Sequence, residues 1–281
     1  MTILEVINKT TPFFQRHGVD SPRLTIELML AHVLQTNRLR LYLDFERELD
    51  EATLARLREL VRRRAAGEPL QYVLGEAEFC GLKLAVDRRV LIPRPETEWL
   101  VEAVVNRAPR TVLDVGTGSG CIALAVARRL PQARVFACDV SEGALVVARE
   151  NARRHDLEKN VRFFASDLLS ACTDGWRVEA IVCNPPYISR GEWGQLPREV
   201  RDFEPGLALL AGEDGLEVMR RLAPQARQHG SETGWVALEV GAGQRGVVVA
   251  IFEKHGFALE EVVTDLQGHE RVVILRPAVG R

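Results

Sequence analysis

The chain has 281 residues, 46% of them hydrophobic and 27% charged, and its formal net charge at pH 7 is −2. This length and apolar content predict two domains, each able to bury its own core. The near-neutral charge offers no long-range attraction for a polyanion, and no apolar run approaches the roughly 20 residues that cross a bilayer. We therefore expect a soluble protein with no membrane association and no obligate nucleic-acid partner.

The segment from residue 1 to 75 is predicted to form a small helical domain, because its apolar residues recur at helical spacing. Its first nine residues lack both a basic-then-apolar signal and an arginine-rich transit segment, so we expect a cytoplasmic protein. Ser21, followed by Pro22, is predicted to cap one helix. Asp50 is predicted to cap a second, which ends in Arg62-Arg63-Arg64, where cations suit the helix dipole or form a binding patch.

A β-hairpin is predicted at residues 76–92, where apolar and polar residues alternate around Gly81. This hairpin would link the helical domain to a second domain at residues 93–281. There the pattern becomes strand, helix, strand, helix, which predicts a doubly wound, mostly parallel α/β sheet covered on both faces. The predicted strands are Thr111–Val115, Arg134–Asp139, Val161–Ala165, Glu179–Cys183, Trp235–Val240, Ala258–Thr264 and Arg271–Leu275, and the predicted helices are Cys121–Leu130, Ser141–His155, Gly215–His229 and Gln244–His255.

The connection between the last two strands is too short for a parallel crossover, so they must pair antiparallel. A parallel sheet that ends in an antiparallel hairpin is typical of the seven-stranded, Rossmann-like methyltransferase fold. Dinucleotide-binding sheets usually continue in parallel.

A glycine-rich loop, Gly116-Thr117-Gly118-Ser119-Gly120, follows the first parallel strand. Glycines at this turn let a ligand approach the backbone closely, so we expect a nucleoside-like cofactor here. The last position of a dinucleotide pattern is Cys121, which does not favour pyrophosphate.

Two carboxylates are predicted to contact the cofactor. Asp139 ends the second strand about 20 residues beyond the glycines, where a carboxylate accepts ribose hydroxyls; it is also placed to cap the following helix. Asp167 follows the third strand and is a candidate acceptor for the adenine amino group, although Ser166-Asp167 also suits a local turn.

Asn184-Pro185-Pro186-Tyr187, here called the NPPY motif, follows an apolar strand and is predicted to lie beside the cofactor crevice. Because proline has no backbone N–H, the Asn184 side-chain oxygen and the Pro185 carbonyl remain as a pair of acceptors. Such a pair suits the two hydrogens of an NH2 group on a planar carbon, and positions the nitrogen against a methyl donor. Tyr187 is expected to pack on the flat face of that group.

With these motifs the chain resembles the peptide chain release factor glutamine methyltransferases over nearly all of its length. Further matching blocks are Leu91-Ile92-Pro93-Arg94-Pro95-Glu96-Thr97-Glu98, Glu204-Pro205, Ala208-Leu209, Asp214-Gly215-Leu216, Glu239-Val240-Gly241 and Gln244. The resemblance implies that Gly116 to Gly120, Asp139 and Asn184 bind S-adenosylmethionine, and that Asn184 to Tyr187 bind the glutamine of a Gly-Gly-Gln motif. Leu168 stands where several members carry Trp, so it would cover the adenine ring only as apolar surface.

The Arg94 block, Leu91 to Glu98, can also be interpreted without the family resemblance. The prolines keep the segment extended, so Arg94 either shapes a pocket wall or belongs to a stiff linker, after which Glu96 to Glu98 begin a helix.

The five cysteines include no Cys-x-x-Cys pair and the six histidines no His-Glu-x-x-His, so we expect reduced thiols and no metal.

Other substrate classes stay open, since adenine N6 presents the same planar NH2 as glutamine. A DNA adenine amino-methyltransferase would need a basic region that holds phosphates, which the first domain lacks. A ribosomal-protein glutamine methyltransferase would share the core motifs, and a binding module without catalysis would have no use for the NPPY motif. We expect a monomeric enzyme whose N-terminal helices and hairpin recognise the release factor.

Overall fold

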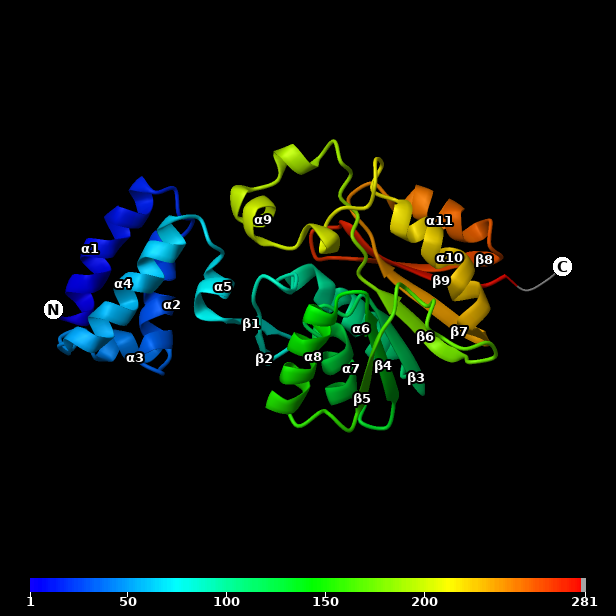
Figure 1. Ribbon diagram of the computed structural model, residues 1–281, viewed down its shortest axis with the longest axis horizontal. Coiled ribbons are helices and arrows are strands. Elements are labelled where there is room, and N and C mark those ends of the chain that lie inside the picture. Colours follow the sequence, from blue (N-terminus) through cyan, green and yellow to red (C-terminus); the bar gives the residue numbers. More distant parts are fainter. Residues whose placement is uncertain (279–281) are drawn as a thin grey trace. The chain divides into compact units, whose positions relative to one another are not determined.

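The computed structural model describes residues 1–278, and the chain divides into two compact units. The first unit contains Met1–Glu76 together with Pro197–Phe203, and the second contains the rest of the chain. Figure 1 shows that the first is made of helices and the second of a sheet with helices against it. Among residues 1–278, no helix has the length and apolar character required for a membrane span.

The helical unit is held together by apolar side chains that face one another across its helices. Ile3, Phe14, Ile26, Leu30 and Leu41 are each almost completely buried in this core. The helices are α1 (Ile3–Arg16), α2 (Pro22–Val33), α3 (Arg38–Leu43), α4 (Glu51–Ala65), α5 (Leu70–Leu74) and α9 (Arg198–Phe203).

One of the two predicted helix caps in this unit is confirmed and the other is wrong. The Asp50 side chain accepts a hydrogen bond from the Thr53 N–H at 2.7 Å, so it caps α4 as predicted. Helix α2 does begin with Pro22, but Ser21 is left-handed, with φ 46° and ψ 57°, and its side chain makes no capping bond. An N-cap serine uses extended backbone to reach the N–H groups of the first turn, which this conformation prevents.

The arginines that end α4 are engaged in ion pairs inside this unit. Arg63 donates two hydrogen bonds to Glu68, at 2.8 and 2.7 Å. The buried Arg64 donates to Glu199 of α9 at 2.6 Å and to the Glu68 carbonyl at 2.9 Å. The short segment containing α9, far away in sequence, is thus tied to the helical unit by a buried cation.

The second unit begins at Ala77, and the predicted hairpin is present but shorter than residues 76–92, because its strands are β1 (Glu76–Phe79) and β2 (Leu82–Ala85). Its two-residue turn, Cys80-Gly81, has positive φ at both positions, which is the geometry of a tight hairpin turn. Phe79, Leu82 and Leu84 are buried in the core on one face of the large sheet.

The large sheet has the predicted doubly wound, mostly parallel topology, with the strand order β5-β4-β3-β6-β7-β9-β8. Its first five strands in chain order run parallel, and β9 pairs antiparallel with both β7 and β8, as the short connection requires. The strands are β3 (Thr111–Val115), β4 (Arg134–Asp139), β5 (Val161–Ala165), β6 (Val178–Cys183), β7 (Gly230–Glu239), β8 (Phe257–Thr264) and β9 (Glu270–Pro277).

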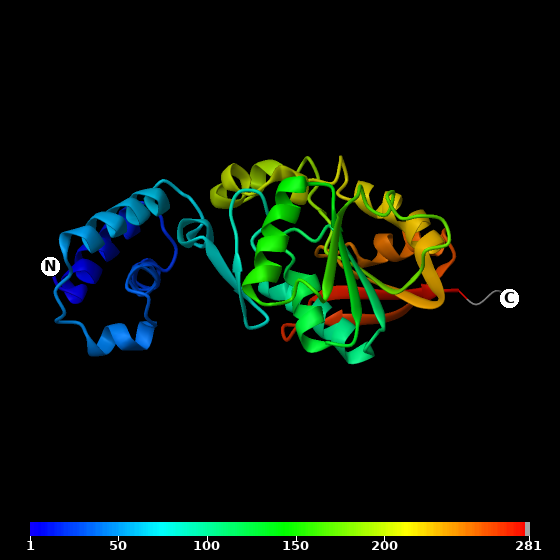
Figure 2. The ribbon, with the colours of Figure 1, turned by 60° about the horizontal axis from the view of Figure 1, so that its bottom comes forward.

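Helices cover both faces of this sheet, as Figure 2 also shows from a second direction. On one face the core contains side chains of α6, α7 and the end of α8, and on the other those of α10 and α11. These helices are α6 (Glu98–Arg107), α7 (Cys121–Arg129), α8 (Glu142–Arg154), α10 (Glu217–His229) and α11 (Arg245–Glu253), and short 3-10 turns lie at η1 (Pro95–Thr97), η2 (Trp193–Gln195) and η3 (Gly206–Ala208).

Strand order reverses between β3 and β6, and such a switch point opens a crevice at the carboxyl ends of the strands. The register there is level, because Val115 of β3 pairs with Cys138 of β4 on one side and with Cys183 of β6 on the other. The residues that come next in the chain therefore emerge at one edge of the sheet. Among them are the glycine loop, Asp139 and Asn184.

Candidate active site

A cleft opens at this edge of the sheet and contains most of the residues predicted to bind cofactor or substrate. Its walls come from the glycine loop, the ends of β4, β5 and β6, and the segment after the NPPY motif. Lining residues include Gly116, Gly118, Asp139, Asp167, Leu168, Asn184, Pro185 and Pro186. Thr117, Ser119, Gly120 and Tyr187 do not line it, and the first three are the buried residues of the loop.

The glycine loop is held against the neighbouring strand by its backbone. The N–H groups of Gly116 and Thr117 both donate to the Cys138 carbonyl at 2.9 Å. Gly118 has φ +55°, and a Cβ added there would meet nothing within 4 Å, so its outer side is open. A ligand can approach this backbone closely, as a nucleoside-like cofactor requires.

Two buried polar residues that the sequence prediction missed hold the loop from below. The Asp114 carboxylate accepts from the Thr117 hydroxyl at 2.6 Å and from the Ala123 N–H at 3.2 Å, and burial raises its pKa to about 7. Asn151 of α8 donates to the Ser119 carbonyl at 2.9 Å. Asp114 lies in the predicted strand Thr111–Val115, directly before the glycine loop, whereas nothing in the sequence singles out Asn151.

Asp139 presents its carboxylate at the cleft wall. One oxygen accepts from the Gly118 N–H at 2.9 Å and the other from the Ser141 N–H at 2.8 Å. Burial raises the pKa of this carboxyl. The cap of α8 is Ser141, whose side chain accepts from the Ala144 N–H, so Asp139 is left with lone pairs for a ligand hydroxyl.

The part of the cleft wall that follows β4 and β5 combines apolar surface with an ion pair. Leu168 lines it with an unusual positive φ of 53°, and Val140, with 51% of its surface exposed, lines the same cleft. Asp167 forms an ion pair with Arg221 of α10, and its carbonyl accepts from the Ser170 N–H in a local turn. Exposed apolar side chains in a cleft suit a flat heterocycle, and with the open glycine loop and Asp139 they fit S-adenosylmethionine.

The side chain of Asn184 is held by a hydrogen-bonded chain that leads away from the cleft. Its Nδ2 donates to the Thr97 hydroxyl oxygen at 3.0 Å, and that hydroxyl donates to Glu239 Oε2 at 2.7 Å. Thr97 is 1% exposed and Glu239 4% exposed, and burial raises the pKa of Glu239 to about 7. Since Nδ2 is engaged in this way, Oδ1 is the end of the amide left for a ligand.

The backbone of Tyr187 is fixed from the other side of the NPPY motif. Its carbonyl accepts from Gln244 Nε2 at 3.1 Å. Gly215, with φ +77°, lies so close that an added Cβ would collide with the Tyr187 carbonyl oxygen and come within 3.1 Å of Gln244 Nε2. Only glycine fits this approach, which explains the Asp214-Gly215-Leu216 block.

The Arg94 block reaches the cleft through Leu91, which lines it, whereas Arg94 does not line the cleft and is paired inside this unit. Arg94 donates to the buried Glu204 at 2.5 Å, and Glu204 accepts in addition from the Ile92 N–H at 3.0 Å. Three sequence blocks that lie far apart in the chain, beginning at residues 91, 204 and 239, thus converge around the NPPY motif.

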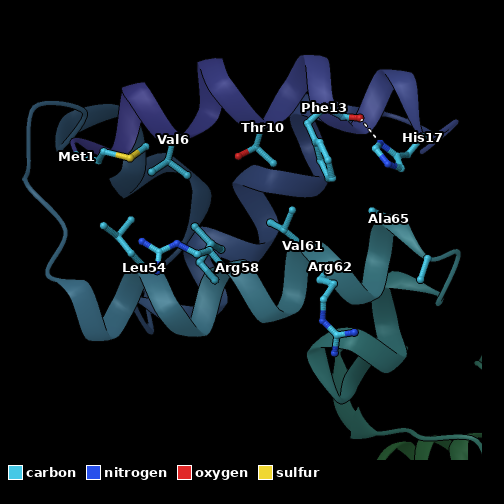
Figure 3. A pocket seen from close by; sticks show the side chains of 12 residues that line it. Met1, Val6, Thr10, Phe13, His17, Leu54, Arg58, Val61, Arg62 and Ala65 are labelled. Atoms are coloured by element: carbon cyan, nitrogen blue, oxygen red, sulfur yellow. Dashed lines mark hydrogen bonds between the residues drawn. The ribbon is translucent and has the colours of Figure 1, made fainter.

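Among residues 1–278, no group of three His, Cys, Asp or Glu side chains is arranged to hold a metal ion, and the five cysteines form no disulfide bond. A separate groove of about 430 Å³ lies in the helical unit between α1 and α4 (Figure 3). Its walls are mainly apolar side chains such as Val6, Phe13 and Leu54, and it contains none of the predicted site residues.

Comparison with known proteins identifies two families along the chain. Residues 5–75 match the PrmC N-terminal domain, and residues 95–195 match the methyltransferase small domain. In solved structures, a methyltransferase from Pyrococcus furiosus is 20% identical, with a TM-score of 0.55 over 82% of this chain and all of that one. A ribosomal protein L11 methylase from Lactobacillus delbrueckii is 21% identical, with a TM-score of 0.50 over 66% and 81%. These likenesses confirm the methyltransferase fold.

Curated relatives are similar over nearly the whole length. A release factor glutamine methyltransferase from Koribacter versatilis is 43% identical over 98% of this chain and 99% of its own. Another from Geobacter sulfurreducens is 42% identical over 97% and 95%. Identity of this extent includes both the helical unit and the sheet unit. The chain belongs to the release factor glutamine methyltransferase family.

Proposed function

We propose that the chain transfers the methyl group of S-adenosylmethionine to the side-chain amide nitrogen of the glutamine in the Gly-Gly-Gln motif of a peptide chain release factor. The observation that carries this proposal is the NPPY motif at the cleft, with the Asn184 amide held so that its oxygen is available. The full-length similarity to release factor glutamine methyltransferases supports the choice of substrate.

In this proposal the cofactor is bound by the residues around the switch point. The backbone of Gly116 to Gly120 receives it closely, Asp139 accepts the ribose hydroxyls, and Leu168 covers the adenine ring. Asp167 is proposed to accept from the adenine amino group with the carboxylate oxygen that Arg221 leaves free. Asn184 is proposed to complete the set, because it lines the same cleft as Gly118 and Asp139.

S-adenosylmethionine supplies a methyl group on a positively charged sulfur, so the leaving group is a neutral thioether and no metal is needed for the reaction. The lone pair of a glutamine amide nitrogen is delocalised and weakly nucleophilic. Asn184 Oδ1 and the Pro185 carbonyl accept its two hydrogens and hold it in line for attack, and effective positioning contributes several kcal/mol. The same oxygens stabilise positive charge that develops on nitrogen, which then releases one proton to solvent. Tyr187 is proposed to pack on the amide plane, although it does not line the cleft in this structure.

Each part of the chain has a proposed role. Residues 1–75 recognise the release factor, the hairpin at 76–92 links this domain to the next, and residues 93–281 bind the cofactor and the glutamine. A single glutamine side chain offers too few contacts for specificity, so a separate recognition domain is required. We further propose a cytoplasmic monomer that needs no nucleic acid as an obligate partner.

A direct experiment compares acceptors with radiolabelled S-adenosylmethionine. The acceptors are a release factor, the same factor with Gly-Gly-Ala in place of Gly-Gly-Gln, a ribosomal protein and duplex DNA. We expect label in the intact release factor alone, and its loss from the Gly-Gly-Ala control places the methyl group on the glutamine. Label found only in the ribosomal protein or only in DNA would refute the proposal and assign the enzyme to one of the two alternative substrate classes.

A further inference from the structure

Thr97 and Glu239 form a polar pair directly behind Asn184, although neither of them lines the cleft. Thr97 ends η1, and Glu239 ends β7, so two elements far apart in the chain bring them together. Both are almost fully buried. Burying a hydroxyl and a carboxylate is unfavourable unless their hydrogen bonds are satisfied, so the packing of a hydrophobic core does not explain their presence.

The direction of each hydrogen bond between Asn184, Thr97 and Glu239 follows from the number of hydrogens that each group carries. An ionised carboxylate only accepts, and a threonine hydroxyl carries a single hydrogen. When Thr97 donates that hydrogen to Glu239, its oxygen can only accept from Asn184. The Asn184 amide must then turn its NH2 group toward Thr97 and its carbonyl oxygen away from it.

We propose that Thr97 and Glu239 are positioning residues, which lock the Asn184 amide so that Oδ1 and not NH2 meets the substrate nitrogen. The inference rests on the proposed function, because the orientation matters only for an acceptor that itself presents N–H groups. In the opposite orientation a donor would face the hydrogens of the substrate NH2 group, and the pair of acceptors would lose one member.

The charge of Glu239 controls this lock. Burial raises its pKa to about 7, and the charged or titratable groups that act on it or respond to it are Glu96, Arg94, Arg271, Tyr187 and Cys183. The two arginines form ion pairs with other carboxylates: Arg94 pairs with Glu204, and Arg271 pairs with Asp265. Once protonated, Glu239 can donate to the Thr97 oxygen, which frees the Thr97 hydrogen for Asn184 Oδ1. Because a protonated carboxyl can donate or accept, the amide is then no longer held in one orientation, so kcat should fall as pH decreases through about 7.

Variants of the pair test this inference with full-length enzyme and a release factor as substrate. Thr97→Val keeps the shape of the side chain and removes the hydroxyl, so we expect kcat to fall roughly 10- to 100-fold, less than the loss of a direct contact. Binding of S-adenosylhomocysteine should stay within about three-fold of wild type in calorimetry. Thr97→Ser, which retains the hydroxyl, should recover most of the rate.

Thr111→Val is the matched control. The Thr111 hydroxyl accepts from the Glu179 N–H at 2.9 Å at the amino end of β3, opposite the cleft edge. This control loses a hydroxyl in the same unit and should keep the wild-type kcat. Wild-type kcat in Thr97→Val would overturn the proposal. If Thr97→Val does not bind S-adenosylhomocysteine, Glu239→Gln decides: its kcat should lose the decline near pH 7 that wild type and Thr97→Ser retain.

A second readout does not depend on catalysis. In 15N spectra of the free enzyme, the Asn184 side-chain NH2 resonance should shift with a midpoint near pH 7 in wild type and not in Glu239→Gln. A pH-independent resonance in wild type would refute the lock, whatever the activity. Absence of methyl transfer by wild type would instead refute the proposed function, so the two failures are distinguishable.

Discussion

Replacing Gly215 by alanine should displace the NPPY motif without touching cofactor or substrate. An alanine Cβ at this position would lie closer than 3.0 Å to the Tyr187 carbonyl oxygen, a separation that real Cβ atoms do not show. An ordinary carbon–oxygen contact needs about 3.3 Å, so Tyr187 would have to retreat by up to about 1 Å. A misplacement of this size near reacting atoms lowers turnover by about 10²-fold. The left-handed backbone adds about 1 to 2 kcal/mol of destabilisation, and overpacking another 1 to 3 or so.

The assay compares Gly215→Ala with Gly268→Ala. Gly268 has φ +83° in the turn between β8 and β9, and an added Cβ there meets nothing within 4 Å. Both variants have the same backbone strain. Urea unfolding should therefore show a larger decrease in the free energy of unfolding for Gly215→Ala, and the difference between the two variants is the overpacking contribution. Only Gly215→Ala should lose turnover, with S-adenosylhomocysteine affinity nearly unchanged. Equal turnover in the two variants would refute the argument that Gly215 positions Tyr187.

Three other variants test the site. Asn184→Ala should keep cofactor affinity and lower kcat by roughly 10² to 10³, the usual loss for a preorganised polar contact; unchanged kcat would remove Asn184 from the mechanism. Asp139→Ala should weaken cofactor binding by about 1 to 3 kcal/mol in calorimetry, and an unchanged affinity would make Asp139 a purely structural residue. Asp114 has a folded pKa raised by burial from 3.8 to about 7, so the folded state holds a proton that the unfolded state releases. The free energy of unfolding should therefore fall as pH rises from about 4 to 7, by at most about 1.4 kcal/mol per pH unit for this group. Asp114→Asn should reduce that slope, and an unchanged slope in urea unfolding would contradict the raised pKa.

The sheet was predictable because its strands are short apolar runs between glycines and helical patterns. β3, β4 and β5 have the predicted bounds, and the antiparallel end follows from the six residues that separate the last two predicted strands. The helix caps were harder, since Ser21 has the right type for a cap but a backbone conformation that no local signal reveals. The docking of α9 on the helical unit was not predictable either, because it depends on an ion pair between Arg64 and Glu199, 135 residues apart.

The site was predictable where residues follow strands directly, and much less so behind them. Gly116, Asp139 and Asn184 emerge together because the ends of β3, β4 and β6 are in register. Thr97 and Glu239 lie in two of the blocks that carry the family resemblance, but the hydrogen bonds that join them to Asn184 depend on tertiary packing. Hydrogen-bond chains of this kind have no spacing rule, so sequence alone left Thr97 as part of a helix start.

The helical unit is not one continuous piece of chain, and this limits where the protein can be cut. A fragment that stops at residue 76 lacks α9, and with it the carboxylate of Glu199 that neutralises the buried Arg64. Without α9 the Arg64 guanidinium loses this ion pair and keeps the hydrogen bond to the Glu68 carbonyl, and the apolar and charged surface that α9 covers is lost with it. A fragment that ends at residue 76 would therefore not reproduce the complete helical unit, and binding studies of this unit, which we propose recognises the release factor, need residues 197–203 as well.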